Sequence, residues 1–96
     1  MDDSRIDEII ASLTSIPHVT GVKRWTKAGK DRLYIETAKF NGGAGWNRGL
    51  GYAGMYLDIA TGDLIRGESA GAKTADALVP TIDAIKAIRD AAWGRS

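Results

Sequence analysis

The sequence predicts an α+β domain in which a small antiparallel sheet of about four strands is flanked by an N-terminal and a C-terminal helix, in the order αββββα. Both ends of the chain show helical periodicity, whereas the middle shows β-branched and aromatic residues around tight turns. The composition, 44% apolar and 26% charged, is typical of globular proteins. With 96 residues and no repeat or long linker, we expect a single domain over residues 1–96.

The first element is an amphipathic helix, expected over residues 4–15. Ser4 or Asp3 is the expected N-cap, and Pro17 ends the helix after Ser15. Isoleucine and leucine recur at the spacing of one helical face, at Ile6, Ile9, Ile10, Leu13 and Ile16.

Residues 19–40 predict two strands joined by a tight turn at residues 28–31. A turn centred on Gly29 and Lys30 sets a register that places Val22, Leu33 and Ile35 together on one face. On the other face, this register places Trp25 opposite Tyr34, Lys23 opposite Glu36, and Lys27 opposite Arg32.

Two further strands are expected over residues 52–59 and 64–67, joined by a Thr-Gly-Asp turn at residues 60–63. Alternation divides the third strand into two faces. The core set is Ala53, Met55, Leu57 and Ile59, and the opposite set is Tyr52, Gly54, Tyr56 and Asp58.

The last element is a helix from about residue 75 to residue 93 that packs on the sheet. Thr74 is the expected cap, Gly94 ends the helix, and Pro80 either separates the first turn or bends the helix. Its apolar stripe consists of Leu78, Ile82, Ile85, Ile88 and Ala92.

Composition excludes several kinds of chemistry. The chain contains no cysteine, which excludes disulfides, thiolate zinc sites and cysteine nucleophiles and favours a reducing, cytoplasmic compartment. The first residues lack the pattern of a signal peptide, and no apolar run is long enough to cross a membrane. His18 is the sole histidine, so a histidine pair for a metal is excluded. We expect neither a cofactor nor a metal.

Charge is distributed unevenly along the chain, although its net value is only +1. Residues 23–48 hold seven bases and two acids, a net charge of +5, whereas residues 1–22 have a net charge of −3. Basic residues alternate with aromatic residues in the predicted hairpin, as they do on protein surfaces that hold phosphates and stack nucleobases. These candidate binding residues are Lys23, Arg24, Trp25, Lys27, Lys30, Arg32 and Tyr34. The alternative is a solvated sheet face with lysines that guard against edge pairing, and with Trp25 covering the core in a register shifted by one residue.

The glycine-rich run at residues 41–54 contains a G-x-G-x-x-G pattern from Gly49 to Gly54. That pattern binds dinucleotides when a helix follows it, whereas here a strand follows, so this function is excluded. The run is either a flexible connection or a binding loop. In the second case Trp46, Asn47 and Arg48 are its contact residues.

Catalytic candidates are few. Asp58, Asp63 and Glu68 lie near one predicted turn, where acids usually serve turn chemistry, and His18 is expected in a connection beside Pro17. An enzyme that uses Asp58, Asp63 or His18 is therefore the least favoured hypothesis.

The segment from Arg24 to Ile35 resembles hairpins in small proteins of phages and mobile elements. The resemblance covers about an eighth of the chain and brings no catalytic residues with it. It implies a compact inhibitor of a bacterial defence system, as anti-CRISPR proteins are, which occupies a site on a larger complex.

The leading hypothesis is thus a non-catalytic interaction protein, an inhibitor of a nucleic-acid-handling bacterial complex whose partner is a protein or a ribonucleoprotein. It would bind through the hairpin and the glycine-rich loop. The alternative hypothesis is direct binding of RNA or single-stranded nucleic acid by the same basic, aromatic hairpin. No membrane partner is expected, and a homodimer through strand edges or helix faces is compatible with each hypothesis.

Overall fold

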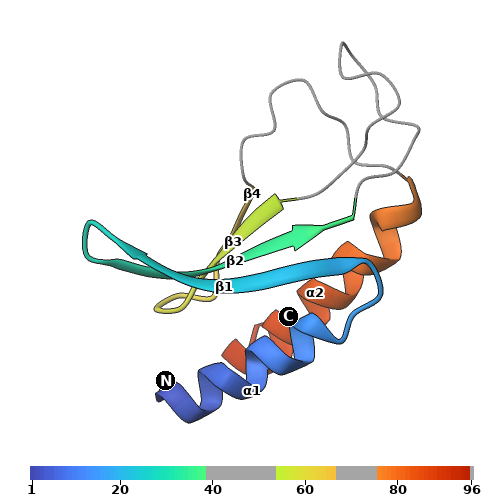
Figure 1. The fold of residues 1–96 in the computed structure, drawn as a ribbon. Helices are drawn as coiled ribbons and strands as arrows, with labels where there is room; N and C mark the ends of the chain where they lie inside the picture. The colour runs from blue at the N-terminus through green and yellow to red at the C-terminus, as the bar shows by residue number, and fades with distance from the viewer. Residues whose placement is uncertain (39–53, 67–75, 96) are drawn as a thin grey trace.

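The computed structural model describes residues 1–38, 54–66 and 76–95 (Figure 1). Two α-helices and a four-stranded antiparallel sheet confirm the predicted α+β class. In chain order the elements are α1 (Asp3–Thr14), β1 (Val19–Lys27), β2 (Lys30–Thr37), β3 (Gly54–Asp58), β4 (Leu64–Arg66), the short 3-10 helix η1 (Asp76–Leu78) and α2 (Val79–Trp93).

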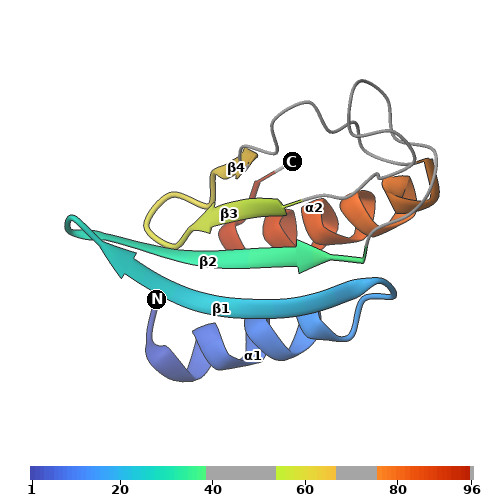
Figure 2. The same ribbon diagram turned by 45° about the horizontal axis from the view of Figure 1, so that its top comes forward.

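The sheet has the strand order β1-β2-β3-β4, with each strand antiparallel to its neighbour. Both helices lie on one side of it, α1 beneath β1 and α2 beneath the remaining strands (Figures 1 and 2). We call this helix-covered side the inner face and the opposite side the outer face. The β1–β2 hairpin extends beyond the helices at one end of the molecule (Figure 1).

The core lies between the inner face and the helices. Leu33, Ile35 and Leu57 of the sheet and Leu13 and Ile85 of the helices are completely buried. Periodicity in the sequence placed these residues on the core side, because alternation in strands and the three-to-four spacing in helices each fix one face.

The helix ends follow from local chemistry. The cap of α1 is Asp2, whose side chain accepts a hydrogen bond from the backbone N–H of Arg5 at 2.8 Å, so the expectation of Asp3 or Ser4 was wrong. Pro80 occupies the first turn of α2, where its missing N–H costs nothing, and η1 forms a separate turn before it. Gly94 ends α2 with a φ of 63°. Thr74, the cap expected from the sequence, lies outside the described residues.

The predicted hairpin register was wrong by two residues. The turn is a two-residue turn at Ala28 and Gly29, with positive φ values of 53° and 76°, and is not centred on Gly29 and Lys30. Because side chains alternate with a period of two, this shift changes the partners but keeps every side chain on its face. The observed pairs are Trp25 with Arg32, Lys23 with Tyr34, Gly21 with Glu36, and Lys27 with Lys30.

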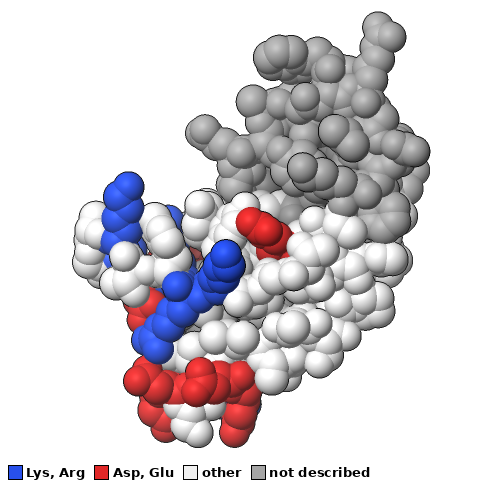
Figure 3. Space-filling model, in the orientation of Figure 1, with Lys and Arg blue, Asp and Glu red and all other residues white. Residues whose placement is uncertain are grey.

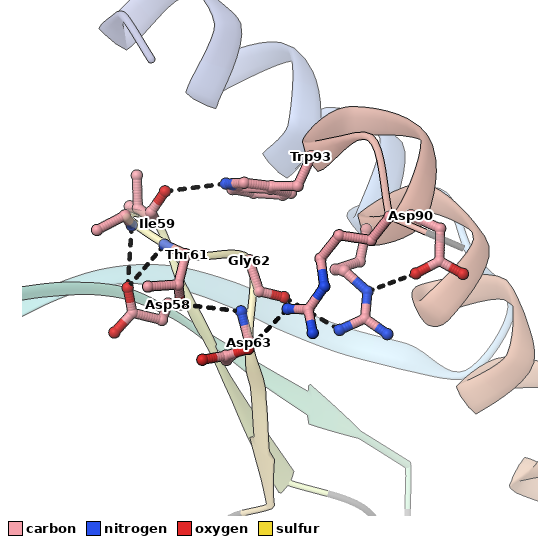
Figure 4. Close-up of polar contacts among 10 residues, drawn as sticks. Asp58, Ile59, Thr61, Gly62, Asp63, Asp90 and Trp93 are labelled. Carbon is pink, nitrogen blue, oxygen red and sulfur yellow. Dashed lines mark hydrogen bonds and ion pairs between the residues drawn. The ribbon is translucent and has the colours of Figure 1, made fainter.

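The end of α2 fastens the β3–β4 turn to the body of the domain (Figure 4). The Trp93 indole donates a hydrogen bond to the carbonyl of Ile59 at 2.9 Å, and Arg89 donates to the carbonyl of Gly62 at 3.1 Å. Gly62 has a φ of 79°, and a Cβ there would lie 2.6 Å from the Trp93 ring. Glycine is therefore required in this turn by both backbone conformation and space.

Candidate binding surface

The outer face brings the basic and aromatic residues of the hairpin together. Strand pairing arranges its side chains in rows that cross the sheet. From the hairpin tip inward, the rows are Lys27 with Lys30; Trp25 with Arg32 and Asp58; Lys23 with Tyr34, Tyr56 and Ile65; and Gly21 with Glu36 and Gly54. We call the five residues Lys23, Trp25, Arg32, Tyr34 and Tyr56 the outer patch.

Three aromatic rings form the centre of the outer patch. The ring centroids of Trp25 and Tyr56 are 5.5 Å apart, and those of Tyr34 and Tyr56 are 4.9 Å apart, with planes tilted by 48° and 44°. Trp25 on β1 thus reaches Tyr56 on β3 across the intervening strand. Trp25 remains 37% exposed, and the two tyrosines are half-buried. Gly54 makes room for Tyr34, since a Cβ there would lie 3.1 Å from the tyrosine hydroxyl oxygen.

Arg32 lies within this aromatic group, in the middle of its row. Its guanidinium carbon is 6.0 Å from the centroid of the Tyr56 ring, a distance at which a cation is attracted to the ring face. Its Nε lies 3.7 Å from Asp58 Oδ2, which is an ion pair but is too long for a hydrogen bond. The side chain is only 18% exposed.

Lysines flank the aromatic centre on two sides, at the β1 edge and at the hairpin tip. Lys23, Lys27 and Lys30 are exposed on the outer face, and none of them forms an ion pair with a residue in the described part of the chain. Figure 3 shows basic side chains over the hairpin and acidic side chains gathered over the first turns of α1. The uneven distribution of charge along the sequence is therefore also uneven in space.

Arg24 is the member of the predicted cluster that lies elsewhere. It is paired with Leu33, so its position in the strand belongs to the inner face. Its guanidinium donates hydrogen bonds to Asp31 at 2.7 and 3.1 Å and to Asp3 at 2.8 Å. These bonds raise the pKa of the Arg24 guanidinium and, chiefly through the bond from Arg24, lower the pKa of the Asp31 carboxyl. Arg24 thus ties the hairpin to the start of α1.

The carboxylates near the β3–β4 turn serve local structure. Asp58 Oδ1 accepts hydrogen bonds from the backbone N–H groups of Ala60 at 2.9 Å and Thr61 at 3.3 Å (Figure 4). Asp63 pairs with Arg95 at 2.6 Å, and this hydrogen bond is the main cause of the lowered pKa of its carboxyl. Glu68 lies outside the described residues.

The remaining candidate residues of the sequence are His18 and three residues of the glycine-rich run. His18 lies in the connection between α1 and β1, with a φ of 74°. Trp46, Asn47 and Arg48 of the glycine-rich run lie outside the described residues. Within the described ranges, no group of three or more His, Asp or Glu side chains is placed to hold a metal ion. No described helix has the length and apolar character needed to cross a membrane.

Tyr56 is the site residue that sequence reasoning missed. Alternation along the third strand placed it on the face opposite the core, but it was not grouped with the hairpin. Its membership depends on the pairing of Tyr34 with Tyr56, which joins β2 to β3. A long intervening segment separates these strands, so local patterns in the sequence did not reveal the pairing.

Comparisons with family models, with curated proteins and with solved structures found no match to this chain. Fold and surface together define an α+β domain with a helix-covered inner face and a basic, aromatic outer face.

Proposed function

We propose that this chain is a non-catalytic interaction protein that binds an acidic partner protein through the outer patch. The observation that carries the proposal is the cluster of Trp25, Tyr56 and Arg32 at the centre of the outer face, with three exposed lysines on the same face. Tryptophan, tyrosine and arginine are the residue types that dominate binding energy at protein interfaces, and charged residues typically form the rim.

The proposal retains the class of partner suggested by the hairpin resemblance, a protein or ribonucleoprotein of a nucleic-acid-handling bacterial complex. By occupying a site on that complex, the protein would act as an inhibitor, as phage-encoded anti-CRISPR proteins do. The chain contains no cysteine, which supports action in the reducing cytoplasm.

Direct binding of single-stranded nucleic acid is the second candidate. It is favoured by three aromatic rings and four basic side chains on one sheet face. Nucleobases stack on aromatic rings, while lysine and arginine side chains hold the phosphates. The tilt of the rings favours the protein partner instead. Tyr34 and Tyr56 pack against one another and are half-buried, which leaves Trp25 as the most accessible ring for stacking.

Affinity capture from a bacterial lysate with matched variants tests the first proposal. The wild-type protein should retain a specific host protein, and Trp25→Ala and Lys23→Glu should each lose it. The controls are Val79→Ala and Lys86→Glu, which make comparable changes at exposed positions of α2 and should retain the partner. Retention by Trp25→Ala together with loss in Lys86→Glu would place the binding surface on the helices and contradict the proposal.

Salt dependence separates the two candidates. Phosphate contacts release counterions, so the affinity for an oligonucleotide must fall steeply as salt rises, whereas an aromatic-anchored protein interface weakens less. Tight binding of oligothymidylate at low salt, with a steep loss at higher salt, would favour the second candidate. Enzymatic turnover that persists through rigorous purification would contradict both.

A further inference from the structure

Arg32 carries a buried polar atom that lacks a hydrogen-bond partner. Its Nε has no hydrogen-bond acceptor, and among the described residues it is the one buried side-chain nitrogen or oxygen in this condition. The closest carboxylate oxygen, Oδ2 of Asp58, is 3.7 Å away. A buried donor that has lost water and gained no acceptor costs free energy, so the protein's own contacts compensate the Arg32 guanidinium only in part.

The surroundings of Arg32 favour an anion. Trp25 lies opposite it on β1, and the Tyr56 ring lies beside its guanidinium carbon at 6.0 Å. Lys23, Lys27 and Lys30 add positive charge on the same face. Asp58 and, two rows away, Glu36 offset part of this charge, but one oxygen of Asp58 already accepts two backbone hydrogen bonds in the β3–β4 turn.

We propose that Arg32 anchors an anion site at the centre of the outer patch and that the anion is a carboxylate of an acidic side chain on the partner protein. This inference rests on the proposed function and specifies what the partner must present. Because Nε is buried, the carboxylate approaches the two terminal nitrogens, whose planar fork matches its two oxygens. Trp25 and Tyr56 then exclude water from the pair, which strengthens the electrostatic attraction.

Ring geometry favours a carboxylate over the phosphate of a single strand. A nucleic acid strand that placed a phosphate on Arg32 would need stacking platforms for the neighbouring bases. Tyr34 and Tyr56 are tilted by 44° and packed against each other, so they offer no consecutive parallel faces. An acidic side chain needs only the guanidinium and the apolar edges around it.

Asp58 provides a variant with an expected gain of binding. Asp58→Asn keeps the Oδ1 acceptor for the N–H groups of Ala60 and Thr61 and removes the negative charge beside Arg32. The Asp58 carboxylate then no longer competes with the partner's carboxylate for the guanidinium. We expect this variant to bind the carboxylate probe several-fold more tightly than the wild type, an effect that misfolding cannot produce.

The test is a binding titration with two probes of equal length, poly-L-glutamate and oligothymidylate, at low salt. The wild-type protein should bind poly-L-glutamate more tightly than oligothymidylate. Arg32→Lys keeps the charge and removes the fork, and it should weaken poly-L-glutamate binding by roughly tenfold. Arg5→Lys, at an exposed position of α1, is the matched control and should bind as the wild type does. Thermal unfolding of each variant verifies that it is folded.

The outcomes distinguish failure of this inference from failure of the proposed function. If Trp25→Ala and Lys23→Glu weaken poly-L-glutamate binding while Arg32→Lys behaves like Arg5→Lys, the outer patch stands and the Arg32 site is overturned. If oligothymidylate binds more tightly and depends on Arg32, the anion is a phosphate and the carboxylate is overturned. If no outer-patch variant affects either probe, both proposals fail.

Discussion

The two faces of the sheet differ in how completely their side chains are buried or paired with other groups of the protein. The inner face is apolar and covered by helices, with Leu33, Ile35 and Leu57 completely buried. The outer face leaves Trp25 37% exposed, three lysines without ion pairs to described residues, and Arg32 Nε without an acceptor. The inner face therefore supplies most of the stability of the fold, whereas the outer face holds the exposed and unsatisfied groups on which the proposed binding function rests.

The largest expected effects separate the two faces directly. Leu57→Ala leaves a cavity in the core and should lower the free energy of unfolding by about 4 kcal/mol. Trp25→Ala removes a larger side chain but loses mainly one ring contact, so it should cost about 1 kcal/mol. Chemical denaturation measures both. Equal losses would mean that the outer face is also a structural core.

Gly62→Ala tests how strongly the packing of α2 constrains the β3–β4 turn. The new Cβ would clash with the Trp93 ring, and residue 62 also has a positive φ. We expect the free energy of unfolding to fall by about 3 kcal/mol. Gly29→Ala is the matched control, because its φ is also positive but nothing lies within 4 Å of the added Cβ. It should cost only about 1 kcal/mol. A similar loss in both variants would show that backbone conformation alone requires glycine at position 62.

Ala28→Asn should stabilise the hairpin that carries the outer patch. Ala28 has a φ of 53°, which disfavours alanine and is tolerated by asparagine, and Asn-Gly is the preferred pair for this turn. We expect a gain of about 1 kcal/mol in the free energy of unfolding. An unchanged or lowered stability would contradict the two-residue turn.

Acid should weaken the ion pair between Arg24 and Asp31, which joins β1 to β2 within the hairpin. Arg24 lowers the pKa of the Asp31 carboxyl below its ordinary value of 3.8. The pair therefore contributes stability above that value and loses the contribution as the pH falls through the lowered pKa. Asp31→Asn should flatten the dependence of stability on pH in this acidic range, measured by thermal unfolding. Arg24→Gln should have the same effect, and the double variant should add nothing further. Additive effects would show that the two residues act independently.

The sequence predicted the faces of the elements better than their partners. Alternation assigned Trp25, Tyr34 and Tyr56 to the side away from the core despite the wrong register, because a shift of two residues preserves the face. The same rule should have separated Arg24 from its neighbours Lys23 and Trp25, since adjacent residues in a strand point to opposite faces. Grouping by position along the chain does not apply this rule.

Long-range pairing was beyond the reach of local patterns. The row of Trp25, Arg32 and Asp58 crosses three strands, and residues 38–53 separate the second from the third. Arg32, with its buried Nε, lies in the middle of that row. Periodicity therefore located the outer face, whereas the contacts that make it a candidate site became apparent only from the strand register.

Photo-crosslinking at two exposed aliphatic positions tests most directly whether the outer face is the binding surface. Ile65 lies in the row of Tyr56 on the outer face, and Val79 lies on α2. Both are exposed, by 37% and 50%, and neither belongs to the outer patch. Each is replaced in turn by p-benzoylphenylalanine, and the protein is irradiated in bacterial cells. We expect a specific protein adduct from position 65 and none from position 79. An adduct from position 79 alone would contradict the assignment of binding to the outer face.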